Sequence, residues 1–485
     1  MKYFILKIVN LSEMQRNIDE FFGLKGRAAN PNQNRQQNSD PPNRYTNPRQ
    51  NYHQNDANLR LPHHTAGLWR MVKPRLLLIA TKQKNTVEDM LEYICDFIVE
   101  TRLAYRNTIN IELLVRIFSE NEAEMLDLLA KIAEYALEVE FLFNQPVRIL
   151  RKYQTVTIDL SQKQIRCLLA LQFWCCLPKQ ENYLDLPKEY TFFKVFGATQ
   201  DRNDSQIAKL KCLFNYFRRS KTASERVKLS FLRRCLEFTP DWNESRSQMS
   251  NLIIIEEQNS MEDYRDKLMI DFANAYIGGG ILSTGCVQEE IMFAKHIEPI
   301  VAMLFTEKLE DKEALIIVGA QRYNETLGYK QSFEWIRNFN EDLSYDNNER
   351  IDSYIVCIDA CNFAGNVYQQ YFPKFVEREL NKAFIGFMGD PGDMKWRDIV
   401  TGRWGCGAFY GNEQLKFLIQ WVAASGAGRN MYFLPWEMKN VEQLLEFKEL
   451  VQNMQVSEVA QAILKLGVNA EHGIFNEVLR ILRLI

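Results

Sequence analysis

Residues 268–290 read LMIDFANAYIGGGILSTGCVQEE, and this stretch holds the pattern that indicates the fold. The apolar run Leu268–Phe272 has the length of a buried β-strand. Three glycines follow at Gly278–Gly280, and apolar residues then recur at helical spacing from Gln288 to Phe305. A buried strand that passes through a glycine loop into a helix is the repeating unit of an α/β domain.

The same alternation of short strands and helices extends over the second half of the chain. We predict further helices at Phe372–Phe387 and Asn412–Ala424. Further strands are predicted at Leu252–Ile255, Ala314–Val318, Tyr354–Ile358 and Met431–Leu434. Because buried strands that alternate with helices form parallel or mixed sheets, residues 246–485 are predicted to be one α/β domain.

The first half of the chain has a different pattern. Over residues 87–238 the apolar residues recur at helical spacing, so we predict an α-helical accessory domain at residues 71–245. One strand is expected within it, at Arg75–Thr81. Ser161 followed by Gln164 is a capping-box pattern and indicates the start of a helix.

The N-terminal segment has the composition of a disordered tail, predicted over residues 1–70. Residues 26–64 are rich in Asn, Gln, Pro and Arg and offer little to bury. Ahead of them lies a four-position pattern that resembles the peptide that binds the replication sliding clamp, the proliferating cell nuclear antigen. Its residues are Gln15, Ile18, Phe21 and Phe22. The resemblance implies that the tail binds this partner through a helical turn.

The composition excludes several classes of function. With a net charge of −3 over 485 residues, no global positive field indicates a polyanionic partner. Three of the five histidines lie in the polar N-terminal stretch, so neither a metal site nor a cofactor is expected. The ten cysteines lack a framework spacing, which is typical of reduced thiols in the nucleus or cytoplasm. No apolar run approaches the length of a membrane span, and we expect a monomer.

Two glycine clusters carry the candidate chemistry. Glycine lets backbone amides approach a phosphate closely, and a helix N-terminus adds its dipole. The loop at Gly278–Gly280 has neither the Lys-Ser/Thr pair nor the GxGxxG spacing of common nucleotide loops. Because Glu289 and Glu290 would repel a phosphate there, we expect them to serve chemistry. A second cluster at Gly402–Gly411 also precedes a predicted helix, so the two loops are expected to hold a diphosphate from both sides.

These segments resemble the poly(ADP-ribose) glycohydrolase family. Its signature is similar to Gly278–Gly280 followed by Gln288-Glu289-Glu290, and Asp271–Asn274 and Trp404–Phe409 are similar in the same order. The resemblance implies a macrodomain, a mixed sheet flanked by helices, with a helical accessory domain. It also implies a hydrolase of the ribose–ribose O-glycosidic bonds of poly(ADP-ribose) on modified proteins, acting in the DNA damage response.

The resemblance implies a role for each matching residue. Glu290 is similar to the catalytic acid, Glu289 to its ribose-holding partner, and Asp271 to a further catalytic carboxyl. Trp436 departs from the family pattern, which has a Tyr-Phe-x-Phe run there, and is expected to pack against the terminal ribose. The residues expected to contact substrate are Gly278, Gly279, Gly280, Gln288, Asn274, Glu262, Met261, Tyr329, Gly405, Cys406, Gly407, Ala408, Phe409 and Trp436.

The chemistry of the bond agrees with a single working carboxyl. The ribose oxygen that leaves must receive a proton from a general acid. In ordinary glycosidases two carboxyls flank the sugar on opposite faces, roughly 5 to 9 Å apart. Consecutive residues do not flank a ring, so we infer that Glu290 protonates the leaving oxygen. It then deprotonates the water that attacks an oxocarbenium-like ribose.

Two other functions fit parts of the sequence. A non-catalytic macrodomain that only binds ADP-ribose would need the glycine loops but not the Glu289–Glu290 pair. A nucleotide-dependent transferase would need a metal site or a phosphate-binding loop lysine, and the sequence has neither pattern. The two carboxylates therefore favour a hydrolase.

Overall fold

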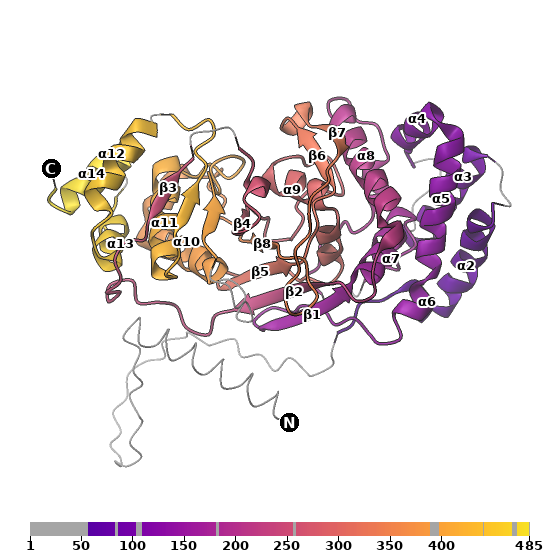
Figure 1. Ribbon diagram of the computed structural model, residues 1–485, viewed down its shortest axis with the longest axis horizontal. Coiled ribbons are helices and arrows are strands. Elements are labelled where there is room, and N and C mark those ends of the chain that lie inside the picture. Colours follow the sequence, from indigo (N-terminus) through magenta and orange to yellow (C-terminus); the bar gives the residue numbers. More distant parts are fainter. Residues whose placement is uncertain are drawn as a thin grey trace, which may run out of the picture.

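The molecule is elongated, with helices at both ends and a sheet between them (Figure 1). This computed structural model describes residues 57–82, 86–102, 109–180, 184–255, 259–388, 397–439, 441–467 and 473–484. Across these ranges, no helix combines the length and the apolar character needed to cross a membrane.

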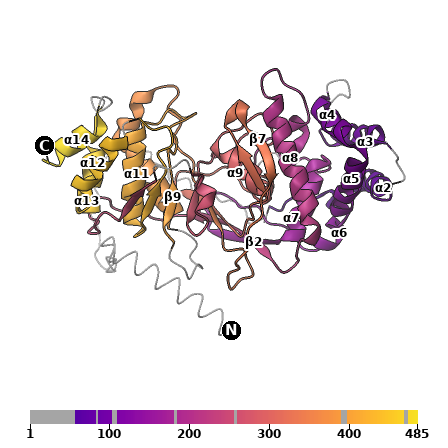
Figure 2. The same ribbon diagram turned by 45° about the horizontal axis from the view of Figure 1, so that its top comes forward.

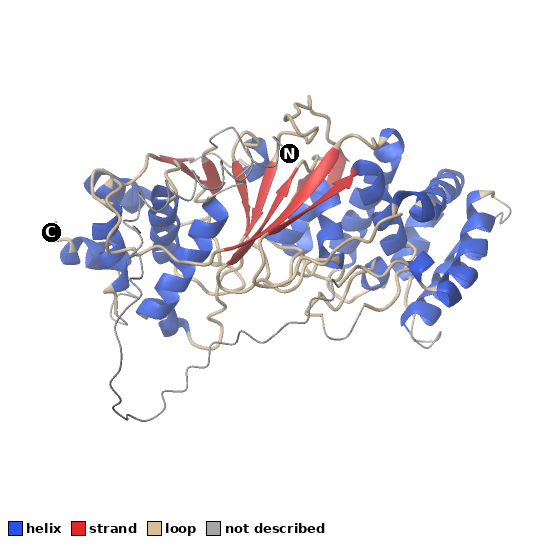
Figure 3. Ribbon diagram, turned by 90° about the horizontal axis from the view of Figure 1, so that it is seen from below, coloured by secondary structure: helices blue, strands red, loops and turns tan. Residues whose placement is uncertain are grey.

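Eight strands form one mixed sheet that crosses the molecule (Figure 3). In spatial order they are β1 (Val156–Ser161), β2 (Lys228–Cys235), β5 (Glu313–Val318), β8 (Tyr354–Cys357), β4 (Leu268–Asp271), β9 (Ile399–Thr401), β10 (Met431–Phe433) and β3 (Leu252–Ile254). Neighbours from β1 to β8 are antiparallel, whereas neighbours from β8 to β3 are parallel. The predicted mixed sheet is confirmed.

The sheet is buried on both faces because its side chains alternate between two cores. In β5, Leu315 and Ile317 face one core, while Ile316 and Val318 face the other. The first core is shared with α7 (Gln162–Phe173), α8 (Asn203–Arg219) and α9 (Gln288–His296). The second is shared with α10 (Pro373–Phe387), α11 (Glu413–Gly426) and α13 (Val456–Leu464).

The remaining elements form the two ends of the molecule and a separate hairpin. The N-terminal end holds α2 (Ala66–Ala80), α3 (Val87–Arg102), α4 (Glu112–Glu120), α5 (Glu122–Leu137) and α6 (Val139–Leu142). The C-terminal end holds α12 (Val441–Val451) and α14 (Ile474–Ile481). A separate hairpin pairs β6 (Asn324–Leu327) with β7 (Glu334–Asn338). Its 3₁₀ turn η7 (Lys330–Ser332) lies beside the glycine loops, as described below.

The strand predicted at Arg75–Thr81 is wrong, because this segment belongs to helix α2. The buried residues Val72, Leu76 and Ile79 have helical spacing, while Leu77 between them is 44% exposed. A short apolar run fits either a strand or one face of a helix, and packing decides between them.

The predicted tail is also too long at its C-terminal end. Leu59 and Leu61 are fully buried, and the Leu59 amide donates to the Val147 carbonyl at 2.8 Å. Residues 57–64 therefore belong to the folded part, although their composition is polar. Residues 1–56 lie outside the described part of the chain.

The predicted helical accessory domain contains two strands of the central sheet. β1 and β2 pair with each other, and β2 continues onto β5, so the sheet crosses the boundary predicted at residue 245. The capping box of Ser161 and Gln164 is confirmed at the start of α7. The helix predicted from Gln288 to Phe305 divides at His296 because Pro299 lacks the amide hydrogen that a continuous helix would use.

Candidate active site

The two glycine loops leave neighbouring parallel strands, β4 and β9. The loop after Asp271 continues β4, the loop after Thr401 continues β9, and Trp436 follows β10. The carboxyl ends of parallel strands lie at one edge of a sheet, and this edge is where ligands bind in open α/β folds. The N-terminus of α9 faces the same edge through Glu289 and Glu290, as their contacts show.

Backbone amides of the first glycine loop hold both carboxylates. Glu289 accepts the Gly278 amide at 2.6 Å and the Asn274 amide at 2.9 Å. Glu290 accepts the Gly280 amide at 2.7 Å and the amide of Val287 at 2.7 Å. The amides of Gly278 and Gly280 thus fix the two side chains that carry the proposed chemistry, and the Gly279 amide donates to the Tyr276 carbonyl at 3.2 Å. The phosphate cradle expected at Gly278–Gly280 stays a prediction.

Side chains larger than hydrogen would displace these carboxylates. A Cβ atom on Gly279 would lie 2.6 Å from a carboxylate oxygen of Glu289 and 2.6 Å from one of Glu290. A Cβ atom on Gly285 would lie 2.7 Å from Glu290 Oε1. Both distances are shorter than van der Waals contact, so the loop needs glycine where the carboxylates approach it.

A third carboxyl lies behind this pair on the last residue of β4. Asp271 is fully buried, and neither of its oxygens has a hydrogen-bond partner among the described nitrogen and oxygen donors. Burial raises the pKa of Asp271 to about 8, the adjacent Cys357 thiol offsets part of the rise, and the charge of Glu290 adds to it. Burial and the charges of Asp271 and Glu290 also raise the pKa of Glu289 well above its ordinary value.

Gln288 connects the helix to the strand that precedes the loop. Its Oε1 accepts the Phe272 amide at 2.7 Å, and its Nε2 donates to the Ile270 carbonyl at 3.4 Å. The side chain thereby ties the first turn of α9 to the end of β4. The ribose contact expected of Gln288, like that of Asn274, stays a prediction.

The second glycine loop offers backbone donors toward the same edge of the sheet. Within the ranges that the structure describes, the amides of Gly407, Ala408 and Phe409 donate no hydrogen bond. Gly405 has a φ of +74°, a left-handed conformation that favours glycine, and its Cβ would lie 2.7 Å from Ala360. The diphosphate contact expected of this loop stays a prediction.

A network of buried ion pairs lies beside the second loop. Asp359, at the end of β8, contacts Arg378 at 2.6 Å and Lys382 at 2.7 Å. Glu379 pairs with Lys416, whose ammonium lies 3.9 Å from the centroid of the Trp404 ring. Each of these buried charges is compensated by a partner of opposite charge next to the loop.

Exposed aromatic side chains lie around the two loops. Tyr329 is 47% exposed, and its hydroxyl lies 4.0 Å from where a Cβ of Gly407 would stand. Trp436 packs against Phe272 with ring centroids 6.2 Å apart and donates to the Asn259 carbonyl at 3.2 Å. The structure therefore brings both predicted aromatics to the site.

Glu262 and Met261 lie in the turn η5 (Met261–Asp263), on the flank of the site. Glu262 is paired with Lys295 of α9 at 2.9 Å, and despite its burial this charge and the Ser260 hydroxyl lower its pKa to about 2. Met261 is buried. The predicted adenine contact of Glu262 stays a prediction, because its carboxylate is already engaged.

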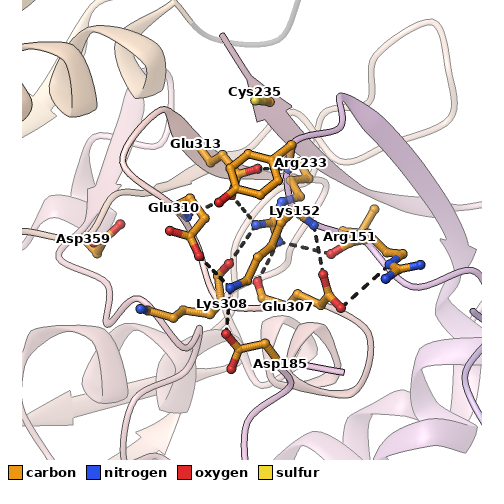
Figure 4. Close-up of polar contacts among 12 residues, drawn as sticks. Arg151, Lys152, Asp185, Arg233, Cys235, Glu307, Lys308, Glu310, Glu313 and Asp359 are labelled. Atoms are coloured by element: carbon orange, nitrogen blue, oxygen red, sulfur yellow. Dashed lines mark hydrogen bonds and ion pairs between the residues drawn. The ribbon is translucent and has the colours of Figure 1, made fainter. Parts of the chain in front are cut away.

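A charged cluster around Lys152 and Arg233 contacts the first loop (Figure 4). Lys152 contacts Asp185 at 2.7 Å and Glu310 at 2.6 Å, and the Tyr276 hydroxyl donates to Asp185. Tyr276 lies between Asn274 and Gly278, so this cluster anchors the loop that holds Glu289. The sequence carried no signal for it, because its members are far apart in the chain.

Lys209 is a further residue that sequence reasoning missed. It lies on α8, far from the glycine signature in sequence, yet its ammonium contacts the carbonyls of the turn after Gly280.

The predicted clamp-binding peptide lies outside the described residues, and with it Gln15, Ile18, Phe21 and Phe22.

Comparisons with known proteins agree with this arrangement. Residues 118–233 match the family model described as "Poly (ADP-ribose) glycohydrolase (PARG), helical domain". Residues 239–443 match the model described as "Poly (ADP-ribose) glycohydrolase (PARG), Macro domain fold". The first match ends within β2, and the second begins between β2 and β3.

Curated relatives carry the same name. Poly(ADP-ribose) glycohydrolase 1 of Caenorhabditis elegans is 30% identical over 360 residues, which cover 71% of this chain and 44% of that protein. Probable poly(ADP-ribose) glycohydrolase 2 of Arabidopsis thaliana is 29% identical over 367 residues, which cover 64% of this chain and 70% of that protein. The chain thus spans less than half the length of the first of these relatives.

A solved structure with the same name is also similar. It is a mutant of poly(ADP-ribose) glycohydrolase from Deinococcus radiodurans in complex with ADP-ribose. The match has 17% sequence identity and a TM-score of 0.27, and it covers 45% of this chain and 93% of that one. A TM-score below 0.5 does not establish a correspondence of folds.

Proposed function

The chain belongs to the poly(ADP-ribose) glycohydrolase family, and we propose that it hydrolyses poly(ADP-ribose) on modified proteins and releases ADP-ribose. The observation that carries this proposal is the pair Glu289 and Glu290, buried and held by amides of the first glycine loop. A module that only binds ADP-ribose has no need to hold two carboxylates beside its ligand.

Glu290 is the general acid and base of the proposed mechanism. Each of its oxygens accepts one amide, and each keeps a second lone pair that can face the substrate. In the first step Glu290 gives a proton to the leaving ribose oxygen as the glycosidic bond breaks. In the second it takes a proton from the water that attacks the oxocarbenium-like carbon, which restores the acid.

The other residues bind and orient the substrate in this proposal. The amides of Gly407, Ala408 and Phe409 bind the diphosphate. Glu289, whose pKa is raised above its ordinary value by burial and by the charges of Asp271 and Glu290, holds a ribose hydroxyl, with Asp271 behind it as a further catalytic carboxyl. Tyr329 and Trp436 cover the ends of the ligand.

The test is Glu290→Gln, assayed with labelled poly(ADP-ribose) followed by separation of the products. Wild type is expected to release ADP-ribose, and the variant to lose hydrolysis by a factor on the order of 100 or more, because glutamine cannot donate the proton. Calorimetry with ADP-ribose should give similar affinities for both proteins, because glutamine keeps the shape of the side chain.

The matched control is Glu334→Gln, a change of the same kind at an exposed position of β7. It should leave turnover unaltered. Wild-type protein that binds ADP-ribose but releases none from polymer would be a binding module instead. Normal turnover by Glu290→Gln would refute the assigned role of Glu290.

A further inference from the structure

Lys209 projects from helix α8 into the turn that follows the first glycine loop. The side chain is 2% exposed, and α8 packs beside α9, which carries Glu289 and Glu290 (Figures 1 and 2). Its ammonium donates to four carbonyls of one turn. They belong to Gly280 at 3.5 Å, Ile281 at 3.2 Å, Ser283 at 2.7 Å and Gly285 at 2.6 Å.

A buried ammonium is costly unless its three hydrogens find acceptors. The carbonyls of Ser283 and Gly285 are the two closest acceptors. Burial lowers the pKa of Lys209 to about 8, while the charge of Glu290 opposes this effect. An apolar side chain would fill the same space without this cost, so we look for the role of the Lys209 ammonium in the turn that it contacts.

The turn that Lys209 holds is the one that positions Glu290. The amide of Gly280, at one end of the turn, donates to Glu290 Oε1 at 2.7 Å. Gly285, at the other end, approaches Glu290 so closely that a Cβ would lie 2.7 Å from the same oxygen. The Gly285 amide also donates to the Gly280 carbonyl at 3.1 Å, which closes the turn.

We propose that Lys209 is a positioning residue for Glu290. By drawing the carbonyls of residues 280–285 toward α8, it keeps the Gly280 amide directed at the Glu290 carboxylate. The helical region thus contributes to catalysis through one side chain, without touching the substrate. This inference rests on the proposed function for its kinetic consequence, whereas its structural consequence can be measured without any activity.

The first test is hydrogen exchange in Lys209→Met, which keeps a chain of similar length but removes the charge and the donors. The amides of residues 279–287 are expected to exchange at least about tenfold faster than in wild type. The matched control is Lys211→Met, the same change two residues along α8, where the side chain is partly exposed. Equal exchange in the two variants would overturn the proposal.

The second test separates catalysis from binding. Lys209→Met should lower kcat on poly(ADP-ribose) roughly tenfold or more, with KM and the calorimetric Kd for ADP-ribose changed less than about threefold. A parallel loss of kcat and ADP-ribose affinity would show a general structural role and overturn the positioning role.

Lys209→Arg keeps the charge with a different donor geometry and should give intermediate exchange and kcat. It also serves if Lys209→Met does not fold. Absence of hydrolysis by the wild type would refute the proposed function, while the exchange experiment would still decide the contact of Lys209 with the turn.

Discussion

At the scale of single residues, the glycine triplet holds and makes room for two carboxylates. The amides of Gly278 and Gly280 are used by Glu289 and Glu290, and Gly279 leaves space for both carboxylates. In the proposed mechanism the first loop therefore positions the reacting side chains, and the second loop binds the anion. A division of this kind avoids placing a phosphate directly against two carboxylates.

Gly279→Ala should abolish most of the activity without unfolding the protein. The new methyl would meet oxygens of Glu289 and Glu290 at 2.6 Å, and Gly279 has a φ of +48°, which alanine tolerates poorly. A displacement of about 1 Å at a reacting group can cost on the order of 100-fold in rate.

Turnover of labelled polymer and the thermal midpoint would be measured together. Gly467→Ala is the control, because nothing lies within 4 Å of its Cβ position. Turnover by Gly279→Ala within about threefold of wild type would mean that the carboxylates do not need their present positions.

At the scale of elements, strand β2 joins the helical region to the sheet through a buried charge. Arg233 and Glu313 form an ion pair in which both side chains are fully buried. Arg233 also donates to the carbonyls of Leu150 and Glu307, at 3.1 and 2.6 Å. The pair thus ties β2 and β5 to the segment that leads into β1, within the cluster of Figure 4.

Arg233→Met should destabilise the protein by about 3–5 kcal/mol, because it leaves Glu313 buried without its cation. Arg233→Met with Glu313→Leu should recover part of the loss, although Glu313 also accepts amides from Tyr153 and Glu310. Arg480→Met, which breaks an exposed pair with Glu477, should change the stability little. Chemical denaturation of all three variants gives the comparison, and equal effects at Arg233 and Arg480 would contradict it.

At the scale of the whole molecule, the helical and macrodomain regions share one hydrophobic core. Side chains of α7 and α8 pack with those of α9 and with one face of the sheet. The helical region is therefore not an accessory domain that could be removed without exposing the core of the macrodomain region. The folded unit also reaches further toward the N-terminus than the composition indicates.

A protein starting at residue 57 should fold and hydrolyse polymer like the full chain, whereas one starting at residue 68 should be less stable. The shorter form loses Leu59 and Leu61, and each fully buried leucine contributes about 1.5–3 kcal/mol. Thermal unfolding and turnover of the two forms give the measurement. Equal stability of both would show that residues 57–67 contribute nothing to the fold.

The protein that starts at residue 57 also serves to test the predicted sliding-clamp partner. A peptide of residues 10–28 should bind the clamp through Gln15, Ile18, Phe21 and Phe22, and the protein from residue 57 should not bind. Phe21→Ala with Phe22→Ala should remove binding by the full chain and leave hydrolysis unchanged, since the two aromatics bury the largest area. No binding of the wild-type peptide at high micromolar concentration would make the pattern a coincidence.

The sequence by itself determined the features that depend on neighbours along the chain. The strand at Leu268–Asp271, the glycine loop, the start of α9 at Gln288 and the adjacent carboxylates are all local patterns, and the structure contains each of them. The helices α10 and α11 were predicted within two residues of their ends for the same reason.

Only the tertiary structure decided the features that depend on contacts between distant segments. Strand β2 pairs with the distant β5, and β1 pairs with β2, while the run Arg75–Thr81 is helical because one of its faces is buried. The contacts of Lys209 and the full burial of Asp271 likewise arise from packing. Periodicity reports which face of a segment is apolar, but it does not report which distant segment covers that face.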